Sequence, residues 1–271
     1  MHLFCFGLGY VSSYIINDLG DNYLVSGSHT GKKPLNLNEY IFNDNEKFNP
    51  EILRTVTHIL ISIPPNSKGD PVFLAFINEI RKLEHLKWIG YFSSTSVYGD
   101  HQGRWVDENS YTDPTDPLGK NRLIAEGQWL ESGLPVNIFR IAAIYGEGRS
   151  VLDSIRSGRA VRIFKENHFF SRIHVRDISQ IIRASFNSSI IGEIFNLADD
   201  LPSMQHEVVE FGYKLLGLEL PEMVNYEEAK LSEMAKRYYN ASKKINNNKV
   251  KDSYKISLMF PSYKEGLSNL F

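Results

Sequence analysis

The sequence has little of what marks several classes of protein. One cysteine, Cys5, occurs among 271 residues, which excludes an intrachain disulfide and a cluster of thiolate metal ligands. Thirty basic and 32 acidic residues leave a net charge of −2, so the chain shows no electrostatic footprint for nucleic acid or an anionic membrane. The eight histidines have no ligand-like spacing. We therefore expect no metal site, no nucleic-acid partner and no membrane partner.

Long apolar runs are missing as well. The longest stretch without Asp, Glu, Lys or Arg covers residues 1–17, and it contains two glycines and two serines. A secretory signal needs a basic start, and a membrane-spanning helix needs about 20 mostly apolar residues. We expect neither feature, and we expect a cytoplasmic protein.

Apolar residues are nevertheless plentiful. They make up 42% of the chain, and aromatic residues make up 12%, which excludes a disordered or low-complexity protein. Cys5 lies within the apolar run Leu3–Phe6, where a free cysteine is typically a small buried residue.

Short apolar runs alternate with helical patterns over the first 140 residues, which is typical of a parallel sheet covered by helices. Strands are expected at 3–6, 23–28, 58–63, 88–92 and 136–141, and helices at 11–19, 72–83 and 118–131. Further helices are expected at 151–158, 178–186 and 204–216, short strands at 160–164 and 170–175, and a polar helix with a loop over 227–250. The sequence thus predicts an α/β fold. A Rossmann-type doubly wound parallel sheet would form a dinucleotide-binding domain over 1–145, and 146–271 would form a smaller α/β substrate lobe, with room for some segments to interleave.

A glycine-rich turn follows the first expected strand. The segment Gly7–Ser12 reads Gly-Leu-Gly-Tyr-Val-Ser, a G-x-G-x-x-G pattern in which Ser12 replaces the third glycine. Gly7 allows a tight turn, Gly9 lets a pyrophosphate approach the backbone, and the following helix presents N–H donors to phosphate. The alternative is an ordinary strand-to-helix turn.

The end of the second expected strand bears on the choice of dinucleotide. An NAD site places Asp or Glu there to bond the ribose hydroxyls, but residues 26–33 contain no acid and end in Lys32 and Lys33. Hydroxyls such as Thr30 and two lysines suit a 2′-phosphate, so NADP is favoured over NAD. The alternative reading of the lysines is a solvated loop.

The segment Phe92–Gly99, with the sequence Phe-Ser-Ser-Thr-Ser-Val-Tyr-Gly, resembles the extended short-chain dehydrogenase/reductases, the sugar-nucleotide epimerase/dehydratase group. Further matches follow in the same order at Val106–Glu108, Phe139–Arg140, Ile144–Gly146, Arg172–Ile178 and Ile194–Ala198. The resemblance covers nearly the whole chain. It implies that Ser94 is the residue that polarises the substrate oxygen.

One departure from that family concerns its Tyr-x-x-x-Lys pair, in which the tyrosine transfers the proton. The matching positions here are Leu118 and Arg122, one helical turn apart. Leucine cannot transfer a proton, although Arg122 can still bond ribose hydroxyls. The chain therefore resembles atypical members of the superfamily that keep the nucleotide site and lack the usual active-site pair.

Other groups could supply the proton. The resemblance makes Ser94 a catalytic candidate. Tyr98 and Tyr145 are further candidates, since they lie on loops at the carboxyl ends of strands, where the nicotinamide is expected, and His174 is better matched to neutral pH. The alternatives are that both tyrosines pack against the core or cofactor, and that Ser94 is only a hydrogen-bonding group at a strand end.

Arg172 and His174 share one face of a short expected strand, and the resemblance implies that this stretch faces the substrate. An arginine fork suits a diphosphate, whereas the alternative for Arg172 is a structural ion pair. Asp177 precedes an apolar helical pattern with Gln180 three residues later, which indicates helix capping.

We therefore predict an NAD(P)-binding oxidoreductase or epimerase/dehydratase-like enzyme for a small, nucleotide-linked or free, alcohol or carbonyl substrate. A non-catalytic NAD(P)-binding sensor or regulatory protein is the alternative. A homodimer is common in the family that the chain resembles. The expected cofactor-binding residues are Gly7, Leu8, Gly9, Tyr10, Val11, Ser12, Ser28, Thr30, Ile63, Pro64, Pro65, Ser93 and Arg122.

Overall fold

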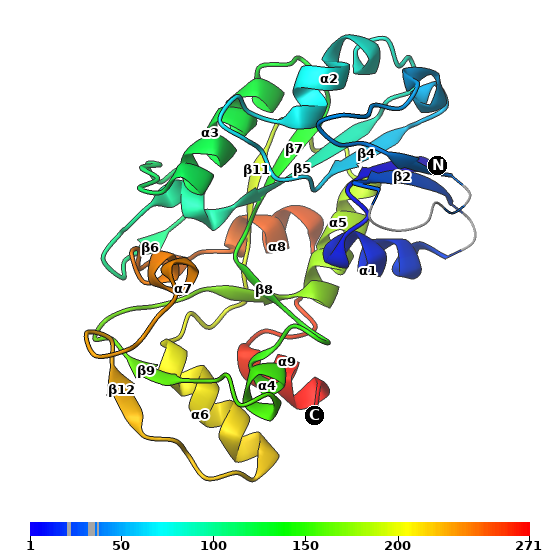
Figure 1. Cartoon of the computed structure of the whole chain (residues 1–271). Helices are drawn as coiled ribbons and strands as arrows, with labels where there is room; N and C mark the ends of the chain where they lie inside the picture. Colours follow the sequence, from blue (N-terminus) through cyan, green and yellow to red (C-terminus); the bar gives the residue numbers. More distant parts are fainter. Residues whose placement is uncertain (21–22, 32–35, 37) are drawn as a thin grey trace. The chain divides into compact units, whose positions relative to one another are not determined.

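The computed structural model describes every residue except 21–22, 32–35 and 37 (Figure 1). Lys32 and Lys33, on which the NADP preference partly depends, lie outside the described residues. The chain divides into two compact units. Unit 1 comprises 1–94, 117–140 and 179–195, and unit 2 comprises 95–116, 141–178 and 196–271. The two units are therefore not separated by a single boundary after residue 145. Segment 95–116 belongs to unit 2 and segment 179–195 belongs to unit 1, because the chain passes repeatedly from one unit to the other.

A seven-stranded parallel sheet in the order β11-β7-β5-β4-β1-β2-β3 forms the centre of unit 1. Its strands are β1 (His2–Phe6), β2 (Leu24–His29), β3 (Glu39–Ile41), β4 (His58–Ile61), β5 (Trp88–Ser94), β7 (Val136–Ile141) and β11 (Ile194–Leu197). Its helices are α1 (Tyr10–Leu19), α2 (Pro71–Ile80), α3 (Pro117–Leu130) and, from Ser179 on, α5 (Val175–Phe186), with a 3-10 turn at Pro50–Leu53. The expected Rossmann-type α/β fold is confirmed.

Helices cover both faces of this sheet. Alternate strand residues such as Phe4, Ile59 and Tyr91 pack with the buried sides of α2 and α3, which lie together on one face in Figure 1. On α1, Asp18 accepts a 2.5 Å hydrogen bond from the Ser179 hydroxyl of α5. Cys5 is fully buried, as expected, and burial raises the pKa of its thiol to about 12.

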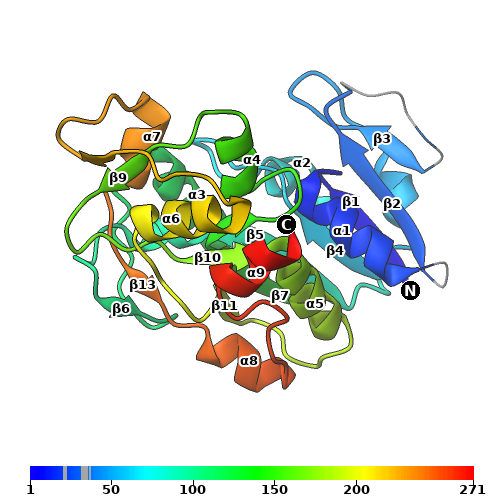
Figure 2. The ribbon, with the colours of Figure 1, turned by 90° about the horizontal axis from the view of Figure 1, so that it is seen from below.

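Unit 2 is built from short strands and helices (Figure 2). Three two-stranded parallel sheets pair β10 (Arg172–His174) with β8 (Ala143–Tyr145), β12 (Met223–Asn225) with β9 (Arg162–Phe164), and β13 (Lys244–Ile245) with β6 (Trp105–Val106). The helices are α4 (Val151–Arg156), α6 (Gln205–Leu216), α7 (Glu233–Tyr238), α8 (Asn248–Tyr254) and α9 (Tyr263–Asn269), and a 3-10 turn covers Thr95–Tyr98. A small core that includes Leu152, Val208 and Leu267 joins α4, α6 and α9.

Two local predictions are wrong. The polar segment 227–250 contains the expected helix as α7, but β13 and α8 form where only a loop was expected. Asp177 does not cap a helix, because α5 begins two residues earlier at Val175. Its buried carboxylate instead accepts hydrogen bonds from the N–H groups of Met259 and Phe260, at 2.6 and 3.2 Å.

The described helices were also compared with the requirements for crossing a bilayer. None of them is both long enough and apolar enough to do so.

Candidate functional site

Three hydrogen bonds within unit 1 hold the glycine-rich turn in place. The N–H groups of Gly7 and Leu8 donate to the Ser28 carbonyl at 3.2 and 2.9 Å, and the Ser62 hydroxyl donates to the carbonyl of Gly7 at 2.9 Å. Gly7 has φ +102°, and a Cβ on it would collide with the Ser62 hydroxyl. Only glycine fits this first position.

Ser12 performs the packing role of the missing third glycine. It is fully buried, and its hydroxyl donates to the Gly7 carbonyl at 2.7 Å, which ties the first turn of α1 to the end of β1. Gly9 is the N-cap of α1, and no side chain caps the helix. A helix N-terminus without a side-chain cap is a place where anions typically bind.

A cavity of about 710 Å³ opens beside this turn, within the size range of small-molecule and cofactor sites. Its walls are the loops that follow β1, β2, β3 and β4, so it lies at the carboxyl ends of parallel strands, where ligands of doubly wound sheets bind. The lining residues are Gly7, Leu8, Gly9, His29, Thr30, Phe42, Asn43, Asp44, Ser62, Ile63, Pro64, Asn66 and Pro71. A Cβ built on Gly9 would meet nothing within 4 Å.

Six of the predicted cofactor residues line this cavity, namely Gly7, Leu8, Gly9, Thr30, Ile63 and Pro64. The other candidates are not among the residues that line this cavity. Ser28 contributes its carbonyl to the turn, and Val11 is buried on α1. Tyr10 stacks edge-on with Tyr14 on the same helix. For Pro65 and Tyr10, a role with the cofactor stays a prediction.

Ser93 and Arg122 contact other parts of unit 1. The Ser93 hydroxyl donates to Glu126 at 2.5 Å, and Glu126 is held by Arg140 through Nη2 at 2.7 Å. Arg122 donates through Nη1 to the carbonyl of Phe92. Both side chains therefore connect α3 to β5 in this structure, and their contact with a cofactor stays a prediction.

The side of the cavity formed after β2 and β3 carries an acid that the sequence pattern did not indicate. Asp44 and Asn43 follow β3 and face the same space as His29 and Thr30, and the Asn43 amide donates to the Thr30 carbonyl at 3.1 Å. The His29 ring lies 3.6 Å from a carboxylate oxygen of Glu39. Asp44 follows the three-residue strand β3, which is too short to be predicted from an apolar run in the sequence.

Position 118, which matches the tyrosine of the family that the sequence resembles, is occupied by an exposed side chain. Leu118 lies in the first turn of α3 and is 58% exposed. No proton can be transferred there, so the remaining candidates must be judged by their surroundings.

The two candidate tyrosines are both buried in unit 2. Tyr98 is completely buried, and its hydroxyl donates to Asn196 at 2.7 Å. Tyr145 donates to the carbonyl of Ser262 at 3.3 Å, and burial raises the pKa of its hydroxyl well above the ordinary value. Ser94 ends β5 in unit 1 and is half-buried.

His174 lies next to Tyr145, because the register of β10 and β8 pairs the two residues. Its ring is 5.1 Å from the Tyr145 ring and 4.1 Å from that of Phe260. Burial lowers the pKa of His174 to about 4, so the imidazole is neutral at pH 7. It is 1% exposed and packs as a core residue.

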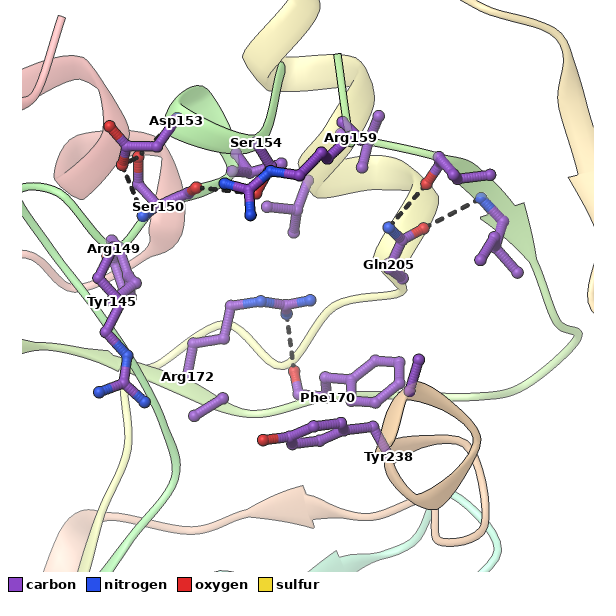
Figure 3. A pocket seen from close by; sticks show the side chains of 18 of the residues that line it. Tyr145, Arg149, Ser150, Asp153, Ser154, Arg159, Phe170, Arg172, Gln205 and Tyr238 are labelled. Atoms are coloured by element: carbon purple, nitrogen blue, oxygen red, sulfur yellow. Dashed lines mark hydrogen bonds between the residues drawn. The ribbon is translucent and has the colours of Figure 1, made fainter. Parts of the chain in front are cut away.

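Arg172 extends into a separate pocket of about 580 Å³ in unit 2 (Figure 3). Its Nη1 donates to the carbonyls of Phe170 and Ser203 and to the Ser203 hydroxyl, at 3.1 to 3.3 Å. Burial lowers the pKa of the guanidinium, which nevertheless stays charged. The oxygens that accept hydrogen bonds from the half-buried Arg172 belong to carbonyls and a hydroxyl, while the nearby Asp199 carboxyl opposes this lowering of its pKa.

Two further arginines, Arg149 and Arg159, line the same pocket. Asp153, the one acid among the described residues that line it, is engaged by Ser150 in a capping box. Phe170 and Tyr238 provide aromatic surface below Arg172 in Figure 3. Guanidinium groups suit an anionic ligand group, because they bond its oxygens in pairs. Arg172 and Tyr145, which both line this pocket, are predicted from the sequence as site residues, whereas Arg149 and Arg159 belong to no motif.

No three His, Cys, Asp or Glu side chains of the described residues come together as a metal site would require.

Comparison with known proteins gives three kinds of result. No family model matches the chain. The curated protein YeeZ of Escherichia coli K12 is 28% identical over 176 residues, and the match spans 62% of each chain. A functionally unknown conserved protein from Silicibacter pomeroyi has a solved structure with 35% identity and a TM-score of 0.91, covering 99% of this chain and 97% of that one.

More distant solved structures share the fold. UDP-glucuronic acid 4-epimerase from Bacillus cereus, in complex with UDP-glucuronic acid and NAD, has a TM-score of 0.79 at 16% identity, covering 98% of this chain and 96% of that one. Human epimerase family protein SDR39U1 with NADPH has a TM-score of 0.74 at 14% identity, covering 100% and 99%. The chain therefore belongs to the family of the Silicibacter pomeroyi protein, and its fold is that of the NAD-dependent epimerase/dehydratase group of short-chain dehydrogenase/reductases.

Proposed function

We propose that the chain binds NADPH or NADH in the cavity beside Gly9 and acts as an oxidoreductase or epimerase/dehydratase-like enzyme on a small alcohol or carbonyl substrate. The observation that carries this proposal is the open cavity at the carboxyl ends of parallel strands, next to an uncapped helix N-terminus. Complexes of similarly folded proteins with NAD and NADPH support it. When bound, the nicotinamide supplies the hydride acceptor or donor.

Replacing Gly9 tests the site directly. Gly9 has an ordinary backbone conformation and open space at its Cβ position, so Gly9→Leu should fold normally while its side chain fills the place of the pyrophosphate. We expect wild-type protein to bind NADPH or NADH with micromolar-order affinity in a nicotinamide-fluorescence titration, and Gly9→Leu to bind neither.

Gly127→Leu is the matched control, because Gly127 on α3 has equally open surroundings and does not line the cavity. It should bind the dinucleotide like the wild type. The absence of binding to either dinucleotide by the folded wild-type protein would refute the proposal.

We propose further that NADPH is preferred to NADH by about tenfold, or about 1.4 kcal/mol. Thr30 and His29, rather than an acid, end the β2 side of the cavity. Asp44 faces the same space and would repel a 2′-phosphate, so Asp44→Asn should widen the preference by raising the affinity for NADPH. Fluorescence titrations with both dinucleotides measure the ratio, and a wild-type preference for NADH would contradict this assignment.

The proposed substrate carries an anionic group that Arg172 receives, as a nucleotide diphosphate would. The hydrogen bonds of the half-buried Arg172 guanidinium go to carbonyls and a hydroxyl, and a ligand anion would form stronger, charge-assisted hydrogen bonds with it. UDP-sugars, UDP and inorganic phosphate should raise the melting temperature of the wild-type protein, and Arg172→Met should remove the effect. Equal shifts in both proteins would favour a structural role for Arg172.

The second candidate function is a dinucleotide sensor without turnover. It is favoured by the exposed Leu118 and by the engaged hydroxyls of Tyr98 and Tyr145. Of the proposed proton donors, Ser94 is the first to test. An acid of this kind contributes about 10²–10⁴-fold in rate, so Ser94→Ala, Tyr98→Phe, Tyr145→Phe and His174→Gln should be distinguishable in a substrate screen. NADPH binding without turnover of any substrate would favour the sensor.

A further inference from the structure

A third cavity, of about 400 Å³, lies in unit 2 and shares no lining residue with the pocket around Arg172. We propose that this cavity binds a neutral saccharide unit. Its lining combines one exposed indole ring with carboxyl and amide groups, and it comes from three segments, namely Trp105, then Asp199 and Asp200, then Ile245, Asn246, Asn247, Asn248 and Lys251.

Trp105 supplies a flat apolar surface. It projects from β6 and is 57% exposed, whereas Trp88 and Trp129 are 1% and 0% exposed. A large aromatic side chain left in water beside a cavity typically marks a binding surface. The C–H face of a sugar ring is the apolar surface that an indole covers best.

Asp200 supplies a fixed hydrogen-bond acceptor. One of its oxygens accepts from Asn247 Nδ2 at 2.7 Å and from Lys251 Nζ at 2.8 Å. Lys251 balances the negative charge, so the carboxylate is held in place without making the wall anionic. Its other oxygen makes no hydrogen bond with the described residues, and it can accept from ligand hydroxyls.

Asp199 adds an unmatched polar atom in the buried wall. The residue is 1% exposed, and Oδ2 has no hydrogen-bond partner among the described residues. Leaving such an atom unmatched costs free energy, which a ligand hydroxyl would recover. Burial raises the pKa of Asp199 to about 8, so the carboxyl is largely protonated and neutral at pH 7.

The wall is rigid. The N–H of Asn246 donates to the Val106 carbonyl at 2.8 Å beyond the β6–β13 pair, and Asn247 Nδ2 donates to the Ala198 carbonyl at 2.8 Å. The amides of Asn246 and Asn248 complete the lining. A polar wall with balanced charge and one indole face favours a neutral polyhydroxylated ring over a metal ion, a phosphate or an organic cation.

The single exposed tryptophan makes the site observable. Acrylamide quenching of the full-length protein would be measured with glucose, N-acetylglucosamine and maltose, and also with tetramethylammonium, phosphate and calcium chloride. We expect at least one saccharide to protect Trp105 at millimolar concentration, and no ionic probe to do so. Protection by an ionic probe alone, or by no probe, would overturn the proposal.

Calorimetric titration with the protective saccharide then locates the site. Trp105→Ala and Asp200→Asn should each weaken binding by at least about tenfold, and Trp105→Phe should retain part of it. Phe271→Ala, which removes a 69% exposed aromatic side chain outside the cavity, is the control and should bind like the wild type. Unchanged affinity in folded Trp105→Ala would overturn the proposal. NADPH binding has its own fluorescence readout, so the two proposals can fail independently.

Discussion

At the scale of single residues, Asp177 matches a helix-capping pattern in the sequence but has a different role in the structure. Its position before an apolar helical pattern predicts a cap, but the Asp177 carboxylate binds the backbone of residues 259–260, more than 80 positions away in sequence. No local pattern carries that information. Ser12 is the opposite case, because its small size alone predicts close packing of α1 on β1, and its hydrogen bond to Gly7 fits that expectation.

Asp177 should also make stability depend on pH. Burial raises its pKa from 3.8 to about 6, so the folded state binds this proton more tightly than the unfolded state does. The contribution to stability is therefore present below about pH 4 and is lost as the pH rises to about 6. Asp177→Asn cannot titrate, so its free energy of unfolding should gain roughly 3 kcal/mol relative to the wild type across that window. Urea unfolding at pH 4, 5, 6 and 7 measures this, and parallel curves would contradict it.

At the scale of elements, apolar runs predict the long strands and the amphipathic helices well. The two- and three-residue strands β3, β6 and β13 leave no such signal, because so few residues show no periodicity. The sequence therefore predicts the glycine-rich turn, which follows a clear strand, but does not predict that Asn43 and Asp44, which follow β3, line the cavity. Arg149 and Arg159 were missed for a related reason. They lie in loops, and only the fold brings them to Arg172.

Helix α3 depends on a buried ion pair. Glu126 and Arg140 are 2% and 5% exposed at their side chains and 2.7 Å apart, and Ser93 bonds the same carboxylate. Glu126→Ala should lower the free energy of unfolding by about 3–5 kcal/mol, because it leaves an uncompensated buried charge.

The double variant Glu126→Leu with Arg140→Met serves as the control, since it removes both charges together. Its loss should be clearly smaller than that of Glu126→Ala in the same guanidinium titration. A double variant at least as unstable as the single one would show that the pair itself stabilises the unit.

At the scale of the whole molecule, neither unit is one continuous piece of chain. A fragment ending at residue 145 lacks β11 and the 179–186 part of α5, both of which belong to unit 1 or its sheet. We expect fragments 1–145 and 146–271, expressed separately, to show no cooperative thermal transition by circular dichroism. A cooperative transition in fragment 1–145 would show instead that the first 145 residues are an independent domain. The homodimer stays a prediction that sedimentation of the intact protein can test.

The position of β11 at the edge of the sheet has a consequence for synthesis on the ribosome. Strand β7 ends at Ile141, but its outer neighbour begins only at Ile194. At 5–20 residues per second, roughly 3–10 s pass between the two. During that interval β7 is a bare edge with unpaired N–H and C=O groups, a template for pairing with other nascent chains. The growing polypeptide therefore has a defined window in which a chaperone is most useful.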